Sequence, residues 1–306
     1  MNRVPEWGGA SKDTIMASLK DVKQKISGVK KTSQITSAMN MVAASKLRGA
    51  QQKMESFRDY ADKFNAAMGN LSAGMQSGQF PLMEAREVKS VEIVVITSDR
   101  GLCGSFNSNN ISKAEKLIAE KQKEGKTVSL VCVGKKGYAK LKRTGLVRKK
   151  YDDIMAKFEM HNARAIAQDV ADNFIDGEAD EVYLLYPAFI SVGLQRPTVM
   201  PFLPVQPTEA DGDAGSEDTA IAYTYEPGAD EIMTVLQPLY LNVMVYHAML
   251  EVGAGEHAAR MTSMDNATKA CGDIVHDLTL VYNKVRQGSI TSELMDIVGG
   301  AEALKG

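Results

Sequence analysis

Apolar residues recur with heptad spacing near the N-terminus of the chain. The positions that share one phase are 19, 22, 26, 29, 47, 50, 54, 57, 61, 64, 68 and 71. A sustained repeat of 3.5 residues is typical of a left-handed coiled coil. No proline falls between Met16 and Gln79, so nothing in the sequence interrupts the helix. The pattern predicts one long N-terminal helix over residues 16–80.

The C-terminal third repeats this pattern, and it predicts a second long helix over residues 228–304. Its predicted seam positions are 236, 239, 243, 246, 250, 264, 267, 271, 274, 278, 281 and 285. We expect Pro238 to kink the first turns. Gly253 and Gly255 each cost about 1 kcal/mol relative to Ala inside a helix, and we interpret them as points of local bending. The two helices can pair as an antiparallel coiled coil if the domain between them returns the chain.

The predicted seam turns polar or small in the middle of both helices. It falls on Ser33, Thr36 and Asn40 of the first helix, and on Gly253, His257 and Arg260 of the second. Polar seam residues weaken pairing between helices. Ile35, Met39 and Val42 lie on a second face instead. Two interpretations stay open: a local stutter that packs against the central domain, or a surface turned outward toward a partner.

Between the helices, residues 88–226 change to the pattern of an α/β domain. Apolar runs that predict buried strands alternate with helical segments, which favours a largely parallel, Rossmann-like sheet. The expected strands are 91–98, 127–134, 181–189, 198–205 and an edge strand 220–226, and the expected helices are 106–124 and 160–176.

Composition and charge narrow the function classes. Of 306 residues, 44% are hydrophobic and 24% charged, as in a globular protein. Residues 17–53 carry eight Lys/Arg and a single acid, which indicates a solvated face or a surface for an acidic protein. Single-stranded nucleic acid is disfavoured because aromatic residues do not interleave there. The first fifteen residues lack the apolar core of a signal peptide, and we expect them to be a disordered extension.

No constellation in the sequence predicts a catalytic, cofactor or metal site. The turn DRGLCG after the first strand has glycines but lacks the remaining elements of a phosphate-binding motif. We therefore expect a tight turn, followed by a helix capped by Asn107 or Ser108. Cys103 has no histidine arranged with it, and three distant cysteines favour a reducing compartment. His161 and the Asp152–Asp153 pair are interpreted as surface residues.

Four segments resemble the gamma subunits of the rotary, F-type proton-translocating ATP synthase. They are ITSAMNMVAASKLRGAQ (35–51), SDRGLCGSFN (98–107), EHAARMTSMDNAT (256–268) and LVYNKVRQGSITSELMDIVGGAEAL (280–304). The resemblance implies a central stalk, with no active site or cofactor of its own, in which the paired terminal helices turn inside a sleeve of alpha and beta subunits. It also implies contacts with the epsilon subunit and the membrane c-ring, at the cytoplasmic face of a bacterial plasma membrane.

The resemblance assigns partner contacts to seven residues. Met39 and Lys46 match positions where the stalk meets an acidic segment of a beta subunit. The polar positions that match contacts to the sleeve are Arg260, Arg286, Gln287, Thr291 and Glu293. An alternative function, a nucleotide-binding α/β enzyme with a coiled-coil dimerisation arm, stays open from the residues alone, and ATP binding by the isolated chain would favour it.

Overall fold

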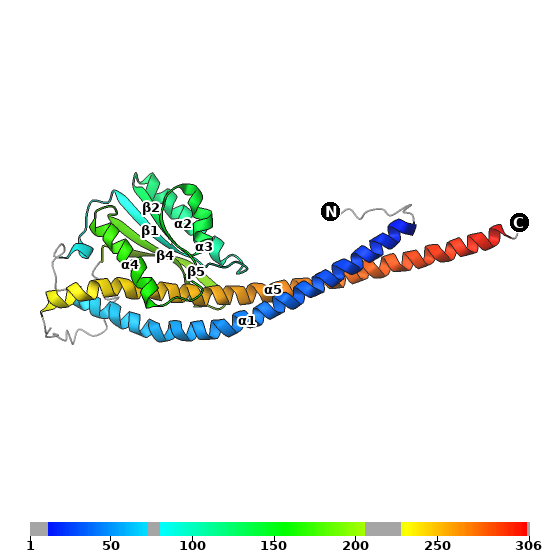
Figure 1. The fold of residues 1–306 in the computed structure, drawn as a ribbon, viewed down its shortest axis with the longest axis horizontal. Coiled ribbons are helices and arrows are strands. Elements are labelled where there is room, and N and C mark those ends of the chain that lie inside the picture. Colours follow the sequence, from blue (N-terminus) through cyan, green and yellow to red (C-terminus); the bar gives the residue numbers. More distant parts are fainter. Residues whose placement is uncertain (1–11, 73–79, 206–227, 305–306) are drawn as a thin grey trace, which may run out of the picture. The chain divides into compact units, whose positions relative to one another are not determined.

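The computed structural model describes residues 12–72, 80–205 and 228–304 (Figure 1). One long helix precedes the central elements in the sequence, and another follows them. The elements are α1 (Lys12–Ser72), η1 (Pro81–Met83), β1 (Ser90–Ile96), α2 (Phe106–Lys123), β2 (Thr127–Val133), α3 (Lys135–Leu141), η2 (Lys142–Thr144), β3 (Val147–Tyr151), α4 (Met160–Ile175), β4 (Glu181–Ser191), β5 (Leu194–Leu203) and α5 (Ala229–Ala303). The α/β class with two long terminal helices is therefore confirmed.

The chain divides into two compact units. The first joins Met1–Met41 to Ser263–Gly306, and the second is Val42–Thr262. In the second unit the strands lie in the order β3-β2-β1-β4-β5. β1 to β4 are mutually parallel, and β5 pairs antiparallel with β4 at the edge. This is the strand order of a Rossmann-type sheet with an antiparallel edge strand.

Both faces of the sheet are covered, which explains why its strands read as continuous apolar runs. On one face Ile93, Val95, Leu130 and Cys132 pack against the apolar side of α2. On the other face Val94, Ile96, Val131 and Val133 join a larger core with α4 and with parts of α1 and α5 (Figure 1). The long helices are thus part of the layer structure of this unit.

Contacts between α1 and α5 establish antiparallel pairing in each unit. In the second unit the ring centroids of Phe57 and Tyr246 lie 4.9 Å apart, and those of Phe64 and Tyr240 lie 6.5 Å apart. In the first unit, Thr36 Oγ1 lies 2.7 Å from Thr268 Oγ1. On α1, the buried heptad residues are Ala43, Leu47, Met54, Ala61, Met68 and Leu71. The seam predicted for the N-terminal helix is confirmed.

The seam predicted for the distal part of α5 is wrong at two positions. Ile274 and Val281 are 47% and 48% exposed, whereas their neighbours Val275 and Tyr282 are half-buried. After Met264, successive residues of the observed seam are alternately four and three positions apart, whereas the predicted seam begins with three and then four. Since each exposed residue stands beside another apolar residue, apolarity alone could not distinguish the two phases.

Other differences concern element bounds. The short strand β3 was not predicted, because VRKKY is charged and its three central residues are exposed. α1 begins at Lys12, inside the expected extension, and α5 continues through Pro238. The expected edge strand 220–226 lies outside the described residues. No helix in the described ranges combines the length and apolarity needed to cross a bilayer.

Gly134 lies between β2 and α3, and a substitution there tests how tightly the backbone packs at the carboxyl edge of the sheet. It has φ +94°, and a Cβ there would overlap the carbonyl oxygen of Thr97. Gly145 has φ +71° with nothing within 4 Å. We expect Gly134→Ala to lower the free energy of unfolding by roughly 3 kcal/mol and Gly145→Ala by roughly 1 kcal/mol, because only the first adds overlap to backbone strain. Equal losses in urea denaturation of the purified chain would contradict the tight packing at Gly134.

Candidate functional site

The seven residues predicted to contact partners divide between the two units. Met39, Arg286, Gln287, Thr291 and Glu293 belong to the first unit, which consists of two helical segments. Lys46 and Arg260 belong to the second unit, which contains the sheet. Each group is described within its own unit.

The helix pair around Met39 has a polar seam. Thr36 is 9% exposed, and its hydroxyl lies 2.7 Å from that of Thr268 on α5. Each hydroxyl also lies within hydrogen-bond distance of a carbonyl in its own helix, Ser33 O at 3.0 Å and Met264 O at 2.8 Å. Because each hydroxyl has one proton, two of these three contacts carry a hydrogen bond at a time. A polar pair at a seam position favours one register of the two helices with little apolar burial.

The apolar residues displaced from this seam do point outward. Ile35 is 60% and Met41 65% exposed, while Met39 itself is half-buried at the margin of the seam. In the second unit, Val42 is 58% exposed. Exposed large apolar residues on a helix pair indicate a surface that binds another protein.

The distal part of α5 combines exposed polar and apolar side chains. Arg286, Gln287, Thr291 and Glu293 are all exposed. Thr291 Oγ1 donates to the carbonyl of Gln287 at 2.9 Å, as exposed helical threonines often do. The large apolar residues exposed alongside them are Ile290, Leu294, Met295, Ile297 and Val298. Such a mixture is typical of a protein interface.

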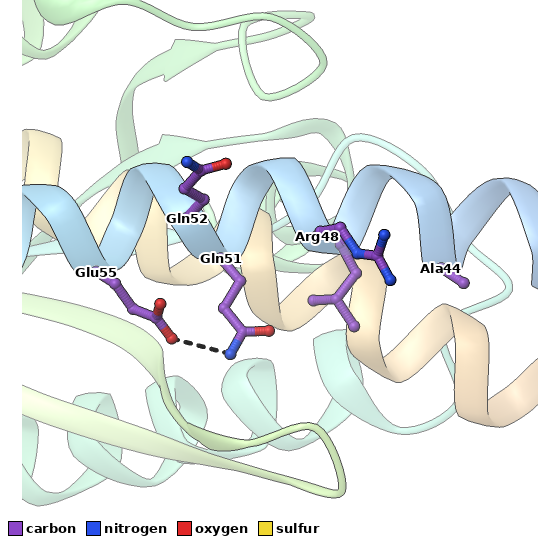
Figure 2. Close-up of a pocket in the computed structure, with 6 residues that line it drawn as sticks. Ala44, Arg48, Gln51, Gln52 and Glu55 are labelled. Atoms are coloured by element: carbon purple, nitrogen blue, oxygen red, sulfur yellow. Dashed lines mark hydrogen bonds between the residues drawn. The ribbon is translucent and has the colours of Figure 1, made fainter.

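Lys46 is exposed on α1. The same helix carries a shallow groove (Figure 2). The groove holds about 410 Å³ and is lined by α1 alone, through Ala44, Leu47, Arg48, Gln51, Gln52 and Glu55. Gln51 Nε2 donates to Glu55 Oε1 at 2.9 Å, and these two side chains lie on one side of the helix while Gln52 points to the other. An open, polar groove on one helix lacks the enclosure typical of a cofactor site.

Arg260, in contrast, is committed to bonds within the chain. Its guanidinium donates to the carbonyl of Gly101 at 3.1 Å and to Glu256 Oε1 at 2.5 Å, and its side chain is only 11% exposed. Burial raises the pKa of Glu256, and the Arg260 charge opposes that rise. Arg260 therefore ties α5 to the turn after β1. Its assigned contact with a partner stays a prediction.

The same carboxyl edge of the sheet is where a Rossmann-type fold would bind a nucleotide. Here the carboxylate of Asp99 accepts hydrogen bonds from the backbone N–H groups of Lys135 at 2.9 Å, Met155 at 2.9 Å and Asp153 at 3.3 Å. A side-chain carboxylate of the chain thus satisfies these amides, which belong to the turns after β2 and β3. This geometry gives no support to the nucleotide-binding alternative.

The remaining candidates of the turn region have structural partners. Asn107 does not cap α2, which begins at Phe106; its Oδ1 instead accepts from the N–H of Ser98 at 3.1 Å. Burial raises the pKa of the Cys103 thiol, which disfavours the nucleophilic thiolate. Asp153 pairs with Lys135 at 2.6 Å. No group of potential metal ligands occurs in the part of the chain that the structure describes.

Two buried acids on α5, Glu251 and Glu256, were not singled out from the sequence. They are each 5% exposed, and they lie in the segment EVGAGEHAAR (251–260). The sequence could have indicated them, because an acid stands at each end of a run of small apolar residues. Such a run is typical of a buried helix, and buried acids require partners. The glycines between them have a packing role. A Cβ on Gly255 would lie 2.9 Å from Phe106, and one on Gly253 would lie 3.3 Å from Phe158.

Comparison with known proteins agrees over nearly the whole chain. A family model described as ATP synthase matches residues 18–304. The ATP synthase gamma chain of Desulfotalea psychrophila is 63% identical over 290 residues, covering 95% of this chain and all of the relative. Among solved structures, a chain of the Tetrahymena thermophila mitochondrial ATP synthase central stalk and c-ring is 26% identical, with TM-score 0.58, covering 76% of this chain and 99% of its own. A rotor chain of the Euglena gracilis mitochondrial enzyme, 19% identical, shares the fold with TM-score 0.66, covering 90% and 99%.

The Arg260–Glu256 pair can be tested by a double-mutant cycle. We expect Arg260→Leu to lower the free energy of unfolding by about 3–5 kcal/mol, because Glu256 is left buried without its partner charge. Adding Glu256→Gln should restore part of this loss, since the uncompensated charge is removed. Lys269→Leu, which removes an exposed ion pair from the same helix, is the control and should have little effect. Urea denaturation measures all variants; a double variant as unstable as Arg260→Leu would contradict the pairing.

Proposed function

The chain belongs to the ATP synthase gamma chain family, and on this premise we propose how it works as the central stalk of the enzyme. It is a non-catalytic subunit that couples rotation of the membrane c-ring to the nucleotide sites of the catalytic subunits. The observation that carries this function is the match over residues 18–304, because it includes both long helices as well as the domain between them.

The geometry is suited to transmitting movement. In the first unit, α1 and α5 pair through a thin seam and leave large apolar side chains exposed. In the second unit, the same two helices pack into the core of the sheet domain. A partner that encloses the first unit can follow its changing surface as it turns, while the second unit gives the helices a rigid attachment.

Contacts with the sleeve of alpha and beta subunits are proposed for particular residues. Met39 and Lys46 face an acidic segment of a beta subunit. Arg286, Gln287, Thr291 and Glu293 offer donors and acceptors to the sleeve from the exposed surface of α5, and each hydrogen bond to a charged group contributes about 1.5–3 kcal/mol. Arg260 contributes less surface than these residues, since most of its side chain is covered.

The remaining elements of the proposal concern the setting of the complex. The epsilon subunit joins this chain beside the α/β domain, and the assembly works at the cytoplasmic face of a bacterial plasma membrane. The 63% identity with a bacterial gamma chain supports this setting. Attachment to the membrane then comes through the c-ring.

Assembly with the catalytic subunits is the direct test of the function. We expect the tagged chain to retain alpha and beta subunits of its own complex through a size-exclusion column, and to hydrolyse no ATP by itself, because the nucleotide sites belong to those subunits. The reconstituted complex should hydrolyse ATP. ATP binding by the isolated chain without retention of alpha and beta subunits would favour the nucleotide-binding enzyme instead.

The contact proposed for Met39 can be tested by introducing a positive charge at this position. We expect Met39→Lys to reduce the number of protons pumped per ATP hydrolysed, because an ammonium beside the acidic segment of a beta subunit forms an ion pair that resists release. The free energy of unfolding should change by about 1 kcal/mol or less, since Met39 is only half-buried. Gln52→Lys, at an exposed polar position on α1 to which no partner contact is assigned, is the control. Equal coupling in the two variants and the unchanged complex would contradict the assignment.

A further inference from the structure

Glu251 lies where three elements of the second unit meet. Its carboxylate is on α5, and Oε2 accepts a hydrogen bond from the backbone N–H of Phe189 on β4 at 3.1 Å. Oε1 accepts from Arg58 on α1 at 3.4 Å. One turn earlier on α5, His247 Nε2 lies 3.5 Å from the same oxygen. A single side chain thus joins both long helices to the sheet.

The Glu251 carboxylate is buried, so its bonds offset the cost of removing its charge from water. Glu251 is 5% exposed, and an unpaired charge at such depth is strongly unfavourable. The N–H of Phe189 lies where the pairing of β4 with β5 shifts register. Burial lowers the pKa of His247 and raises the pKa of Tyr186, which Glu251 raises further. Arg58 is the cation that compensates the carboxylate, and its side chain stays 41% exposed.

Apolar packing alone does not fix the helices against the sheet under a twisting load. The core that joins α1, α5 and the sheet is held by burial of area, and the hydrophobic effect is non-directional. Hydrogen bonds, in contrast, weaken steeply when their geometry changes. The bond from Arg260 to Gly101 joins α5 to one turn. Glu251 reaches α1 as well as β4.

We propose that Glu251 is a positioning residue for rotational coupling: it locks α1, α5 and the sheet into one body, so that torque on the α/β domain reaches both helices without slippage. This inference rests on the proposed function as a rotor. It assigns to Glu251 no contact with another subunit. Weakening its bonds softens the joint within the chain while leaving the surfaces that bind the catalytic subunits unchanged.

The test uses the complete ATP synthase reconstituted in vesicles with Glu251→Gln, Glu251→Ala and Arg58→Gln. Glu231→Gln, an exposed carboxylate on the same helix, is the matched control. Protons pumped per ATP hydrolysed should be highest in the control, lower in Arg58→Gln and Glu251→Gln, and lowest in Glu251→Ala, because Gln keeps an acceptor for Phe189 and Ala keeps none. Hydrogen exchange of the Phe189 amide should accelerate about tenfold or more in Glu251→Ala only.

The outcomes separate this inference from the proposed function. Faster exchange at Phe189 with unchanged coupling in every variant would show a merely structural role and overturn the inference. If Glu251→Ala does not assemble, Glu251→Gln and Arg58→Gln decide: coupling equal to the control in both overturns the inference. Failure of the unaltered chain and the control to bind alpha and beta subunits would instead overturn the proposed function.

Discussion

The burial of α5 on two sides at once is the constraint on which the second unit depends. Between residues 241 and 260 almost every position is buried, because the sheet domain covers one side and α1 the other. A helix that is apolar all round is stable only when enclosed in this way. The glycines of this segment follow from the same constraint, since Phe106 and Phe158 lie where larger side chains would be. Local bending, the interpretation drawn from the sequence, is not needed to explain them.

The two helical segments of the first unit are held together by different contacts from those of the second unit. Their seam rests on half-buried residues and on the hydroxyl pair Thr36–Thr268, with only a few buried apolar side chains. A polar seam defines register at a cost in stability, and the large apolar residues lie outside. The sequence left a stutter and a partner surface as alternatives, and the exposure of Ile35 and Met41 is what the partner surface predicts.

Features that depend on the periodicity of apolar residues could be predicted from the sequence. Features that depend on contacts between residues far apart in the sequence could not. The heptads predicted both helices and their antiparallel pairing, and the apolar runs predicted most of the parallel sheet. Val275 and Tyr282 were missed because their neighbours are equally apolar. Arg260 was identified by resemblance as a polar contact, but its bond to Gly101 joins residues 159 positions apart, which no local pattern reveals. The charged edge strand β3, which pairs with β2, was missed because it is charged, and its Arg148 pairs at 2.7 Å with Glu92, fully buried on β1.

Strand order and function can now be related in this fold. The order β3-β2-β1-β4-β5 creates a switch point between β1 and β4, where other proteins of this topology bind nucleotides. In this chain the Asp99 carboxylate, in the turn after β1, accepts hydrogen bonds from amides in the turns after β2 and β3, and Arg260 donates to the carbonyl of Gly101 in the turn after β1. These bonds hold α5 and the three turns together. At this edge the polar groups that the fold leaves at its strand ends are used to attach α5 and to join the turns to one another, so the carboxyl edge contributes to the attachment of the long helix.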